Sequence, residues 1–275
     1  MVKKVLITGN SGYIGSHLTK MLKDEYEVYG LDRVEPQEAP DTFYHCDINR
    51  PFSLEDEFDC VIHLAALVNV GESEQKPIQY YITNLNGTMN VLNKIKTKNF
   101  IFASTGAAQD CCSAYGISKR AAEDIVKEFC TIHRPTPYTI FRFYNVIGST
   151  VVAPTNPDGL MYNLMKARET GEFTVFGNDY EVSDDGTCVR DYVHVNEICD
   201  ALMQAIEKPS NSVESLGHGV GYTVKEIVDK FQKVNNVDFN VKYGPRRKGD
   251  IASSVLENVS PYMRNLYTMD QLLKV

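Results

Sequence analysis

Short runs of apolar residues alternate with helix-period stripes through the first half of the chain. The runs are rich in β-branched and aromatic residues, and they occupy residues 5–8, 28–31, 43–46, 61–64, 100–103 and 138–143. Continuous apolar runs of this length are typical of buried parallel strands. Between them, apolar residues recur every three or four positions, as at residues 14, 18 and 21, at 85, 89 and 92, and at 122, 125, 126 and 129. This alternation predicts an α/β fold built on a doubly wound parallel sheet.

The rhythm changes near residue 148. Two prolines and a glycine interrupt the segment 148–171, which we expect to lead into a second region. Later, a helix is expected over residues 197–206 with Asn196 as its N-cap. Another is expected over residues 224–234, opened by the capping box that begins at Thr223. The second half is therefore predicted to be mixed α/β.

Length and composition agree with a globular protein of one large domain or two modest ones. The chain has 275 residues, of which 43% are hydrophobic and 23% are charged, which disfavours disorder, collagen-like repeats and coiled coils. Together with the change of rhythm, this predicts a larger domain over residues 1–147, to which residues of about 187–210 return. A smaller substrate-binding region would then occupy residues 148–275.

Charge and hydropathy exclude several kinds of partner. There are 28 Lys and Arg against 36 Asp and Glu, a net charge of −8, which argues against binding nucleic acid through a basic face. Only three apolar residues precede Thr8 after the two N-terminal lysines, too few for the core of a signal peptide. The longest apolar stretch, residues 61–70, is too short and too interrupted to cross a membrane. We expect a soluble protein without nucleic-acid or membrane partners.

The seven cysteines give no sign of a disulfide framework or a zinc site. Their number is odd, they form no Cys-x-x-Cys pair, and Cys111 and Cys112 are adjacent. None of the six histidines has metal-ligand spacing. We therefore expect reduced thiols, a cytoplasmic location and no bound metal.

A glycine-rich turn joins the first predicted strand to the first predicted helix. Gly9, Gly12 and Gly15 are spaced three apart, and such a turn lets backbone N–H groups approach a pyrophosphate at a helix N-terminus. The next strand ends at Asp32, 17 residues after Gly15, where a carboxylate would bind the ribose hydroxyls of an adenosine. Asp32 favours NAD because it would repel the 2′-phosphate of NADP, although the neighbouring Arg33 leaves NADP open. The turn and the carboxylate together predict a Rossmann-type domain that binds a dinucleotide.

Tyr115 and Lys119 are four residues apart, on one face if the stretch is helical. A tyrosine with a pKa of about 10 needs about 4 kcal/mol of preferential phenolate stabilisation to act as a base near pH 7. The Lys119 ammonium and a cationic nicotinamide ring can both contribute, whereas an ordinary exposed Tyr and Lys would have no such role. The strand over residues 100–103 ends in Ser104 and Thr105, at the sheet edge where ligands bind. These four residues are predicted to remove a proton from a substrate hydroxyl during hydride transfer.

The glycine spacing resembles that of the short-chain dehydrogenase/reductase superfamily, and nearly the whole chain resembles its extended branch, specifically the UDP-glucose 4-epimerase family. The similar stretches are residues 7–17, 61–66, 71–73 with 76–77, 86–88, 142–145, 176–180, 185–187, 189–194 and 246–250. The last three are the most informative, because membership of the superfamily alone does not require them.

This resemblance implies an NAD-dependent 4-epimerase that inverts C4 of a UDP-hexose through a transient 4-keto sugar, with Tyr115 as the base and Thr105 bound to the reacting oxygen. It places the cofactor against Gly9, Gly12, Tyr13, Ile14, Gly15, Asp32, Arg33, Asp47, Ile48, Leu64, Ala65, Ala66, Asn84, Tyr115, Lys119 and Tyr144. It places the UDP-sugar against Thr105, Asn145, Leu160, Arg190, Arg247, Asp250 and Ser254. The two arginines would pair with the diphosphate and Asp250 with the uridine ribose.

Departures from the family pattern leave the sugar open. Ser254 stands where relatives restricted to glucose and galactose carry a bulky Tyr, which leaves room for the N-acetyl group of UDP-GlcNAc or UDP-GalNAc. Gly159 stands near the usual position of an Asn beside the uracil, so that contact could be missing. The helices that contain Leu85 and Ile125 resemble those that pair in the family's homodimers, although both could simply cover the sheet.

Four other functions compete with the epimerase hypothesis. A nucleotide-sugar 4,6-dehydratase needs an acid/base pair beside the catalytic Thr, but Thr105 is followed by Gly106, Ala107 and Ala108. Decarboxylases and simple sugar reductases of the same fold carry less weight. A non-catalytic NAD-binding regulator commonly lacks the active Tyr or Lys, whereas both are present here.

Overall fold

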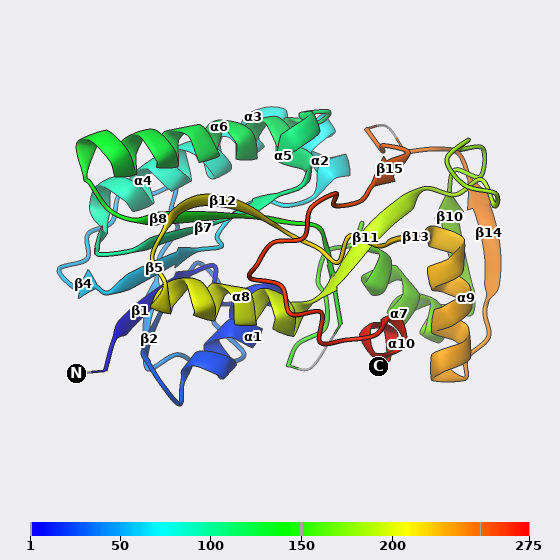
Figure 1. The fold of residues 1–275 in the computed structure, drawn as a ribbon, viewed down its shortest axis with the longest axis horizontal. Coiled ribbons are helices and arrows are strands. Elements are labelled where there is room, and N and C mark those ends of the chain that lie inside the picture. The colour runs from blue at the N-terminus through cyan, green and yellow to red at the C-terminus, as the bar shows by residue number, and fades with distance from the viewer. Residues whose placement is uncertain (1, 149–150, 248, 275) are drawn as a thin grey trace.

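A seven-stranded parallel sheet forms the centre of the computed structural model, which describes residues 2–148, 151–247 and 249–274 (Figure 1). The strand order is β12-β8-β7-β5-β1-β2-β3, and all six pairings are parallel. The strands are β1 (Lys4–Thr8), β2 (Glu27–Asp32), β3 (Thr42–His45), β5 (Cys60–His63), β7 (Phe100–Thr105), β8 (Tyr138–Phe143) and β12 (Asn211–Leu216). The six expected strands all form, and the predicted doubly wound α/β fold is confirmed.

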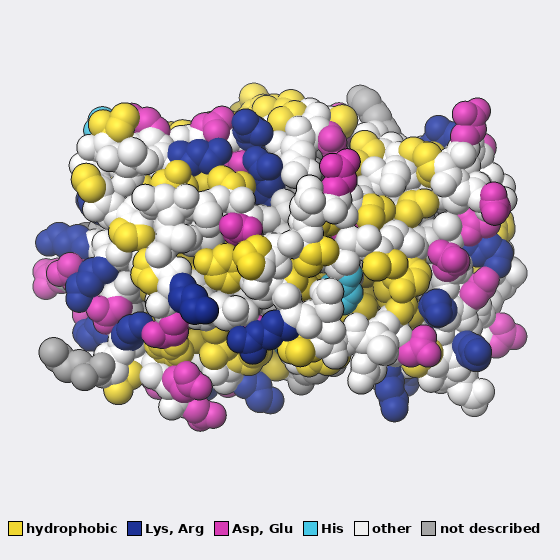
Figure 2. Space-filling model, viewed as in Figure 1, with side chains coloured by type: hydrophobic (Ala, Val, Ile, Leu, Met, Phe, Trp, Pro, Cys, Tyr) yellow, Lys and Arg dark blue, Asp and Glu magenta, His cyan; other side chains and the backbone are white. Residues whose placement is uncertain are grey.

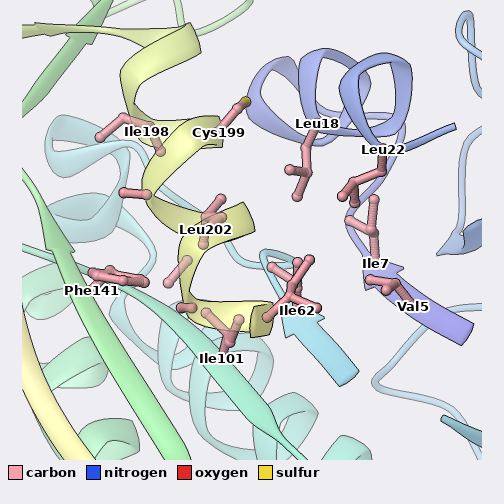
Figure 3. Close-up of a cluster of buried hydrophobic side chains, with 14 of the residues drawn as sticks. Val5, Ile7, Leu18, Leu22, Ile62, Ile101, Phe141, Ile198, Cys199 and Leu202 are labelled. Atoms are coloured by element: carbon pink, nitrogen blue, oxygen red, sulfur yellow. The ribbon is translucent and has the colours of Figure 1, made fainter. Parts of the chain in front are cut away.

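Helices cover both faces of this sheet. On one face, α1 (Tyr13–Leu22) and α8 (Val195–Glu207) direct Leu18, Leu22 and Leu202 onto strands β1, β5, β7 and β8 (Figure 3). On the other face lie α4 (Gly87–Lys94) and α6 (Ala114–Glu128) (Figure 1). The two buried clusters explain why the sheet strands are apolar along their whole length.

The segment of the second half that packs on the central sheet is longer than the expected residues 187–210. Strand β12 pairs with β8 at the edge of the sheet, so the return extends past residue 210 to Leu216. Helix α8 also begins earlier than expected. The ring Nδ1 of His194 accepts the backbone N–H of Asn196 at 3.0 Å, so the N-cap is His194 and the prediction of Asn196 is wrong. Histidine is not among the usual capping residues, so the sequence pattern favoured Asn196, two residues after the actual N-cap.

The second half builds a smaller layer of helices and strands around a third apolar cluster. As predicted, Thr223 and Glu226 form the capping box that opens α9. The main elements of this layer are α7 (Leu160–Thr170), β10 (Glu172–Phe176), β11 (Val189–His194), α9 (Val224–Asn235), β14 (Asn240–Gly244) and α10 (Met269–Leu273).

The elements not yet named are short and occur in both halves of the chain. They are β4 (Glu57–Phe58), α2 (Val70–Gln75), α3 (Pro77–Tyr81), η1 (Ile82–Asn86), β6 (Lys96–Thr97), α5 (Ala107–Asp110), η2 (Phe129–His133), β9 (Asn145–Ile147), β13 (Gly221–Thr223) and β15 (Ser253–Ser254).

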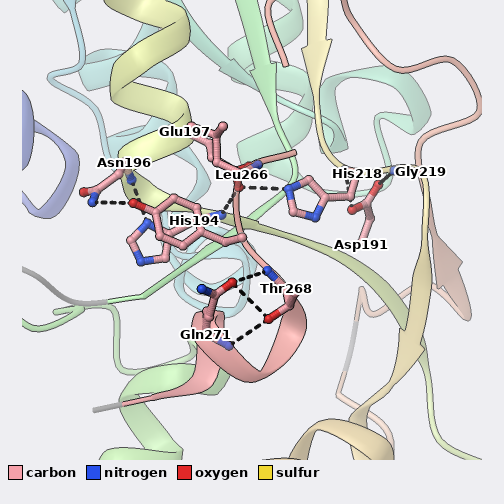
Figure 4. Close-up of polar contacts among 10 residues, drawn as sticks. Asp191, His194, Asn196, Glu197, His218, Gly219, Leu266, Thr268 and Gln271 are labelled. Carbon is pink, nitrogen blue, oxygen red and sulfur yellow. Dashed lines mark hydrogen bonds and ion pairs between the residues drawn. The ribbon is translucent and has the colours of Figure 1, made fainter. Parts of the chain in front are cut away.

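A buried polar cluster lies where β11 leads into α8. The Asp191 carboxylate accepts the backbone N–H groups of His218 and Gly219, and Glu197 accepts those of His194 and Leu266 (Figure 4). Asp191 also accepts the backbone N–H of Leu256. The His218 ring also lies 2.8 Å from Glu197. These bonds fix the C-terminal segment across the end of β11, and they satisfy carboxylates that would otherwise be costly to bury.

The surface carries mixed charge. On the face shown in Figure 2, Lys and Arg side chains are interspersed with Asp and Glu. None of the described helices combines the length and the apolar character that a membrane crossing requires. Within the described ranges, no group of three or more His, Cys, Asp or Glu side chains is placed to hold a metal ion, and all seven cysteines are free thiols.

Candidate active site

The glycine turn packs directly against the ends of the central strands. Gly9 has a φ of +78°, and a Cβ there would lie 2.7 Å from the backbone nitrogen of Ala65. A Cβ on Gly15 would lie 2.2 Å from the carbonyl oxygen of Gly9. Only glycine allows this turn, because a side chain at either position would collide with backbone. Helix α1 therefore starts close to the sheet with its N-terminal amides directed toward the space above the strands.

The Asp32 carboxylate lies beside the turn. One oxygen accepts the backbone N–H of Ser11 at 3.1 Å, and the other accepts that of Val34 at 3.1 Å. Each oxygen keeps lone pairs for a further donor, so Asp32 can still bind ribose hydroxyls.

A cavity of about 640 Å³ extends from this turn across the carboxyl ends of the strands. Fifteen of the sixteen predicted cofactor residues line it, namely Gly9, Gly12, Tyr13, Ile14, Gly15, Asp32, Arg33, Asp47, Ile48, Leu64, Ala65, Ala66, Tyr115, Lys119 and Tyr144. The backbone amides of the glycine turn, the Asp32 carboxylate and the apolar walls fit a dinucleotide such as NAD.

Asn84 is the exception, and its predicted contact with the cofactor is corrected. It lies inside the π-helical segment η1 rather than opening a helix, and it is 1% exposed. Its side chain accepts the backbone N–H of Leu67 and donates to the Leu67 carbonyl and to the hydroxyl of Ser118. Asn84 thus supports the cavity wall from behind.

Helix α6 carries the predicted base and the predicted ammonium. It begins at Ala114 because the Ser113 hydroxyl accepts the N–H of Gly116 at 3.1 Å. Tyr115 is therefore in the first turn and Lys119 in the second, on one face that reaches both the larger cavity and the strand end at Thr105.

Burial dominates the protonation of these groups. It raises the pKa of Tyr115 to about 12, while hydrogen bonding from Thr105 acts in the opposite direction. Burial lowers the pKa of Lys119 to about 7, and the nearby Glu123 partly offsets this. The phenol is therefore protonated near neutral pH, and Lys119 does not offset the effect of burial.

The hydroxyl of Ser104 is bound to a buried carboxylate. It donates to Glu123 Oε1 at 2.6 Å, and the side chain is 3% exposed. Successive residues of a strand point to opposite faces, so Ser104 points to the underside of α6 while Thr105 is directed to Tyr115. Ser104 lines the larger cavity as Thr105 does, and the catalytic roles of both residues stay predictions.

A second cavity, of about 300 Å³, adjoins the first at Tyr115. All seven predicted substrate residues line it, namely Thr105, Asn145, Leu160, Arg190, Arg247, Asp250 and Ser254. The Arg247 guanidinium lies 4.1 Å from the ring centroid of Phe176, and Arg190 Nη2 lies 3.9 Å from Asp250 Oδ1. The cavity thus combines two guanidinium groups with the side chains of Asp110, Asp158 and Asp250 and with the phenol of Tyr115. The guanidinium groups suit an anionic ligand and the other groups suit its hydroxyls.

Sequence reasoning missed several lining residues. Gly159 does line both cavities, but Asn156 lines both as well, and Asn163 lines the second, so amide side chains are present close to that glycine. Phe176 belongs to the stretch 176–180 that resembles the epimerase family, but the sequence assigns it no contact. Its place beneath Arg247 could not be inferred, because the two residues meet only in the folded protein.

The buried histidine of β5 predicts an acid-sensitive stability. His63 lies between the hydroxyls of Thr8 and Thr88, at 2.6 and 3.0 Å, and burial together with the charge of Lys119 lowers its pKa to about 3. The unfolded chain, with a histidine pKa of about 6.5, binds the proton more readily, so stability is present above pH 6.5 and is lost as the pH falls.

We expect the low pKa of His63 to lower the free energy of unfolding by about 2 kcal/mol when the pH falls from 7.5 to 5. Urea unfolding of the protein and of a His63→Gln variant at both pH values measures it, because the other histidines cancel in the difference. The gap in unfolding free energy between the two proteins should narrow by that amount at pH 5. An equal gap at both pH values would contradict the prediction.

Comparison with known proteins agrees with this geometry. The model of the NAD dependent epimerase/dehydratase family matches residues 5–217. A UDP-glucose 4-epimerase from Haemophilus influenzae is 32% identical over 90% of this chain and 88% of its own length. A probable UDP-arabinose 4-epimerase from Arabidopsis thaliana is 33% identical over 96% and 76%. The crystal structure of UDP-glucose 4-epimerase from Bifidobacterium longum in complex with NAD+ and UDP superposes with a TM-score of 0.86, at 26% identity over 98% of this chain and 96% of that one. The chain belongs to the NAD dependent epimerase/dehydratase family.

Proposed function

We propose that the protein is an NAD-dependent UDP-hexose 4-epimerase, an isomerase that interconverts UDP-glucose and UDP-galactose. The observation that carries this proposal is the meeting of the two cavities at Tyr115. One contains the glycine turn and Asp32, and the other contains Arg190 and Arg247. A dinucleotide and a nucleotide sugar would then approach one another at the phenol. The names of relatives that cover most of the chain, and the NAD+ and UDP of the similar crystal structure, support this reading.

The residues of this chain can perform the proton chemistry. Arg190 and Arg247 would bind the diphosphate and leave the sugar ring free to turn within the second cavity. Thr105 would hydrogen-bond the 4-hydroxyl while Tyr115 takes its proton, and Tyr115 would return that proton after the 4-keto sugar has turned. NAD, when bound, supplies the reversible hydride acceptor for C4. Both hydroxyls reach the second cavity, as this sequence of events requires.

The competing activities fit less well. A 4,6-dehydratase needs an acid/base pair next to Thr105, where the cavity wall is formed by Gly106 and Ala107. A regulator that only senses NAD has no need for the phenol and the amine to reach one cavity, as Tyr115 and Lys119 do.

The test is an assay with purified protein and no added reductant. UDP-glucose and UDP-galactose should interconvert to the same equilibrium mixture from either side, as read by NMR. A panel of UDP-, GDP- and dTDP-sugars separates the alternatives, because a dehydratase would yield a 4-keto-6-deoxy product. No conversion of any UDP-hexose would refute the proposal.

N-acetylated UDP-sugars are proposed as further substrates, because the wall of the second cavity carries the small side chain of Ser254. A Ser254→Tyr variant is expected to lower kcat/KM for UDP-GlcNAc about tenfold or more relative to UDP-glucose, since the ring would fill the space for the acetyl group. Ser253→Tyr is the matched control, because Ser253 is the exposed neighbour on β15 and lies outside the cavity. An unchanged substrate ratio in Ser254→Tyr would exclude this extension.

A homodimer and a cytoplasmic location are also proposed. Exposed apolar side chains lie on α3, η1, α4, α6 and η2, namely Ile78, Ile82, Met89, Ile117 and Ile132. Burying them against a second copy would remove apolar surface from water. Sedimentation that shows only monomer would exclude the dimer.

The seven free thiols support the cytoplasmic location, which cell fractionation tests.

A further inference from the structure

The buried carboxylate of Glu123 lies one helical turn beyond Lys119, the predicted ammonium of the site. Lys119 is 3% exposed and Glu123, four residues later on α6, is fully buried. This spacing places both side chains on one face of the helix, where a lysine and a glutamate commonly pair. Among the described residues, however, no hydrogen bond or ion pair involves the Lys119 amine. Its Nζ instead lies 4.1 Å from the ring centroid of Phe102 and lines the larger cavity.

Glu123 accepts three hydrogen bonds from the sheet beneath it. Arg142, on β8, donates through Nε to Oε1 at 2.8 Å and through Nη2 to Oε2 at 2.6 Å. Ser104, on β7, donates to Oε1 at 2.6 Å. The planar fork of arginine suits such a two-point contact, and the added hydroxyl leaves little acceptor capacity for another cation.

We propose that Arg142 and Ser104 are positioning residues, which keep Glu123 occupied so that the Lys119 amine stays over Phe102 and directed into the cofactor cavity. A buried carboxylate that lost Arg142 would need another cation. Lys119 has a flexible side chain on the same face of α6 and would supply that cation. The inference rests on the proposed function in so far as the larger cavity is taken to hold NAD.

The other charged groups near this pair do not replace Arg142. His63 is buried on β5 with its ring centroid 5.7 Å from that of Phe102, and it is neutral at physiological pH because burial lowers its pKa to about 3. Lys127 lies one turn beyond Glu123, with its Nζ 4.0 Å from Oε2, and it is partly exposed. Lys127 is therefore a peripheral partner, and its removal provides a control.

The decisive comparison is between Arg142→Gln and the double variant Arg142→Gln/Glu123→Gln. The single variant is expected to weaken NAD+ binding and to lower kcat, each about 10- to 100-fold, because the Lys119 amine moves toward Glu123. The double variant has no carboxylate to attract the amine and should recover both quantities to within about threefold of the original protein. A purely structural role for Arg142 predicts no recovery. Calorimetric titration of nucleotide-free protein with NAD+ gives the affinity without any substrate.

Two further measurements secure the outcome. A crystal structure of Arg142→Gln should show Lys119 Nζ within ion-pair distance of Glu123, and an amine that remains over Phe102 would overturn the inference whatever the activity. If Arg142→Gln does not fold, Arg142→Lys, which covers only one carboxylate oxygen, should show a smaller loss that Glu123→Gln also rescues. Lys127→Gln should leave NAD+ affinity unchanged. If the protein converts no UDP-sugar but the rescue is observed, the proposed function fails and this inference stands.

Discussion

Replacement of Tyr115 with phenylalanine is expected to lower kcat for the interconversion of UDP-glucose and UDP-galactose by about 10²- to 10⁴-fold. The phenol reaches both cavities and interacts with the hydroxyl of Thr105, whereas the ring itself is buried. The substitution therefore removes one proton carrier and keeps the packing. Water cannot easily take over the proton, because Tyr115 is only 9% exposed in the protein without ligands.

The measurement compares turnover, bound NAD and thermal stability in the same preparation. Tyr115→Phe should keep its NAD content and its melting temperature, so that the loss is confined to the chemical step. Tyr81→Phe is the matched control, since Tyr81 lies on α3 and lines neither cavity. Turnover by Tyr115→Phe within a few-fold of the original protein would refute the role of the phenol as the base.

Most of the fold could be predicted because its strands are buried on both faces. A strand such as β7 is apolar along nearly its whole length, so its sequence is readily recognised. The edge strand β12 was missed for the opposite reason. It pairs only with β8, and its sequence N-S-V-E-S-L has just one fully buried residue, Leu216. An edge strand with mixed exposure carries no apolar run to detect.

The candidate site was predictable where local sequence determines it. The glycine turn and the spacing of Tyr115 and Lys119 are local patterns, and the residues concerned do line one cavity. Ser104 shows the limit of such patterns, because a position at a strand end can face either way and a one-residue change of register reverses it. The pairing of Glu123 with Arg142 was equally hidden, since residues 19 positions apart on a helix and a strand meet only in the folded protein.

Substitution of Gly15 with alanine is expected to weaken NAD+ binding by about 100-fold or more and to destabilise the protein by about 1–3 kcal/mol. The new Cβ would lie 2.2 Å from the Gly9 carbonyl oxygen and 2.6 Å from the Cα of Asn10, both of them backbone atoms. The turn cannot simply move aside, because the Gly9 N–H donates to the Leu31 carbonyl at 2.9 Å. Relief of the clash must then shift α1 from the sheet or distort the turn, and either change misplaces the amides that would face the pyrophosphate.

Calorimetric titration with NAD+ and urea unfolding measure the two effects separately. Gly244→Ala is the matched control, since Gly244 ends strand β14 and a Cβ there would approach no atom closer than 3.4 Å. That variant should bind NAD+ as the original protein does, because β14 lies outside the larger cavity. A Gly15→Ala protein that folds and keeps its NAD+ affinity would show that the cofactor does not rest on this turn. The dinucleotide assignment would then lose its main geometric support, because a Cβ at Gly9 or Gly15 would collide with backbone atoms and the turn therefore requires glycine at both positions.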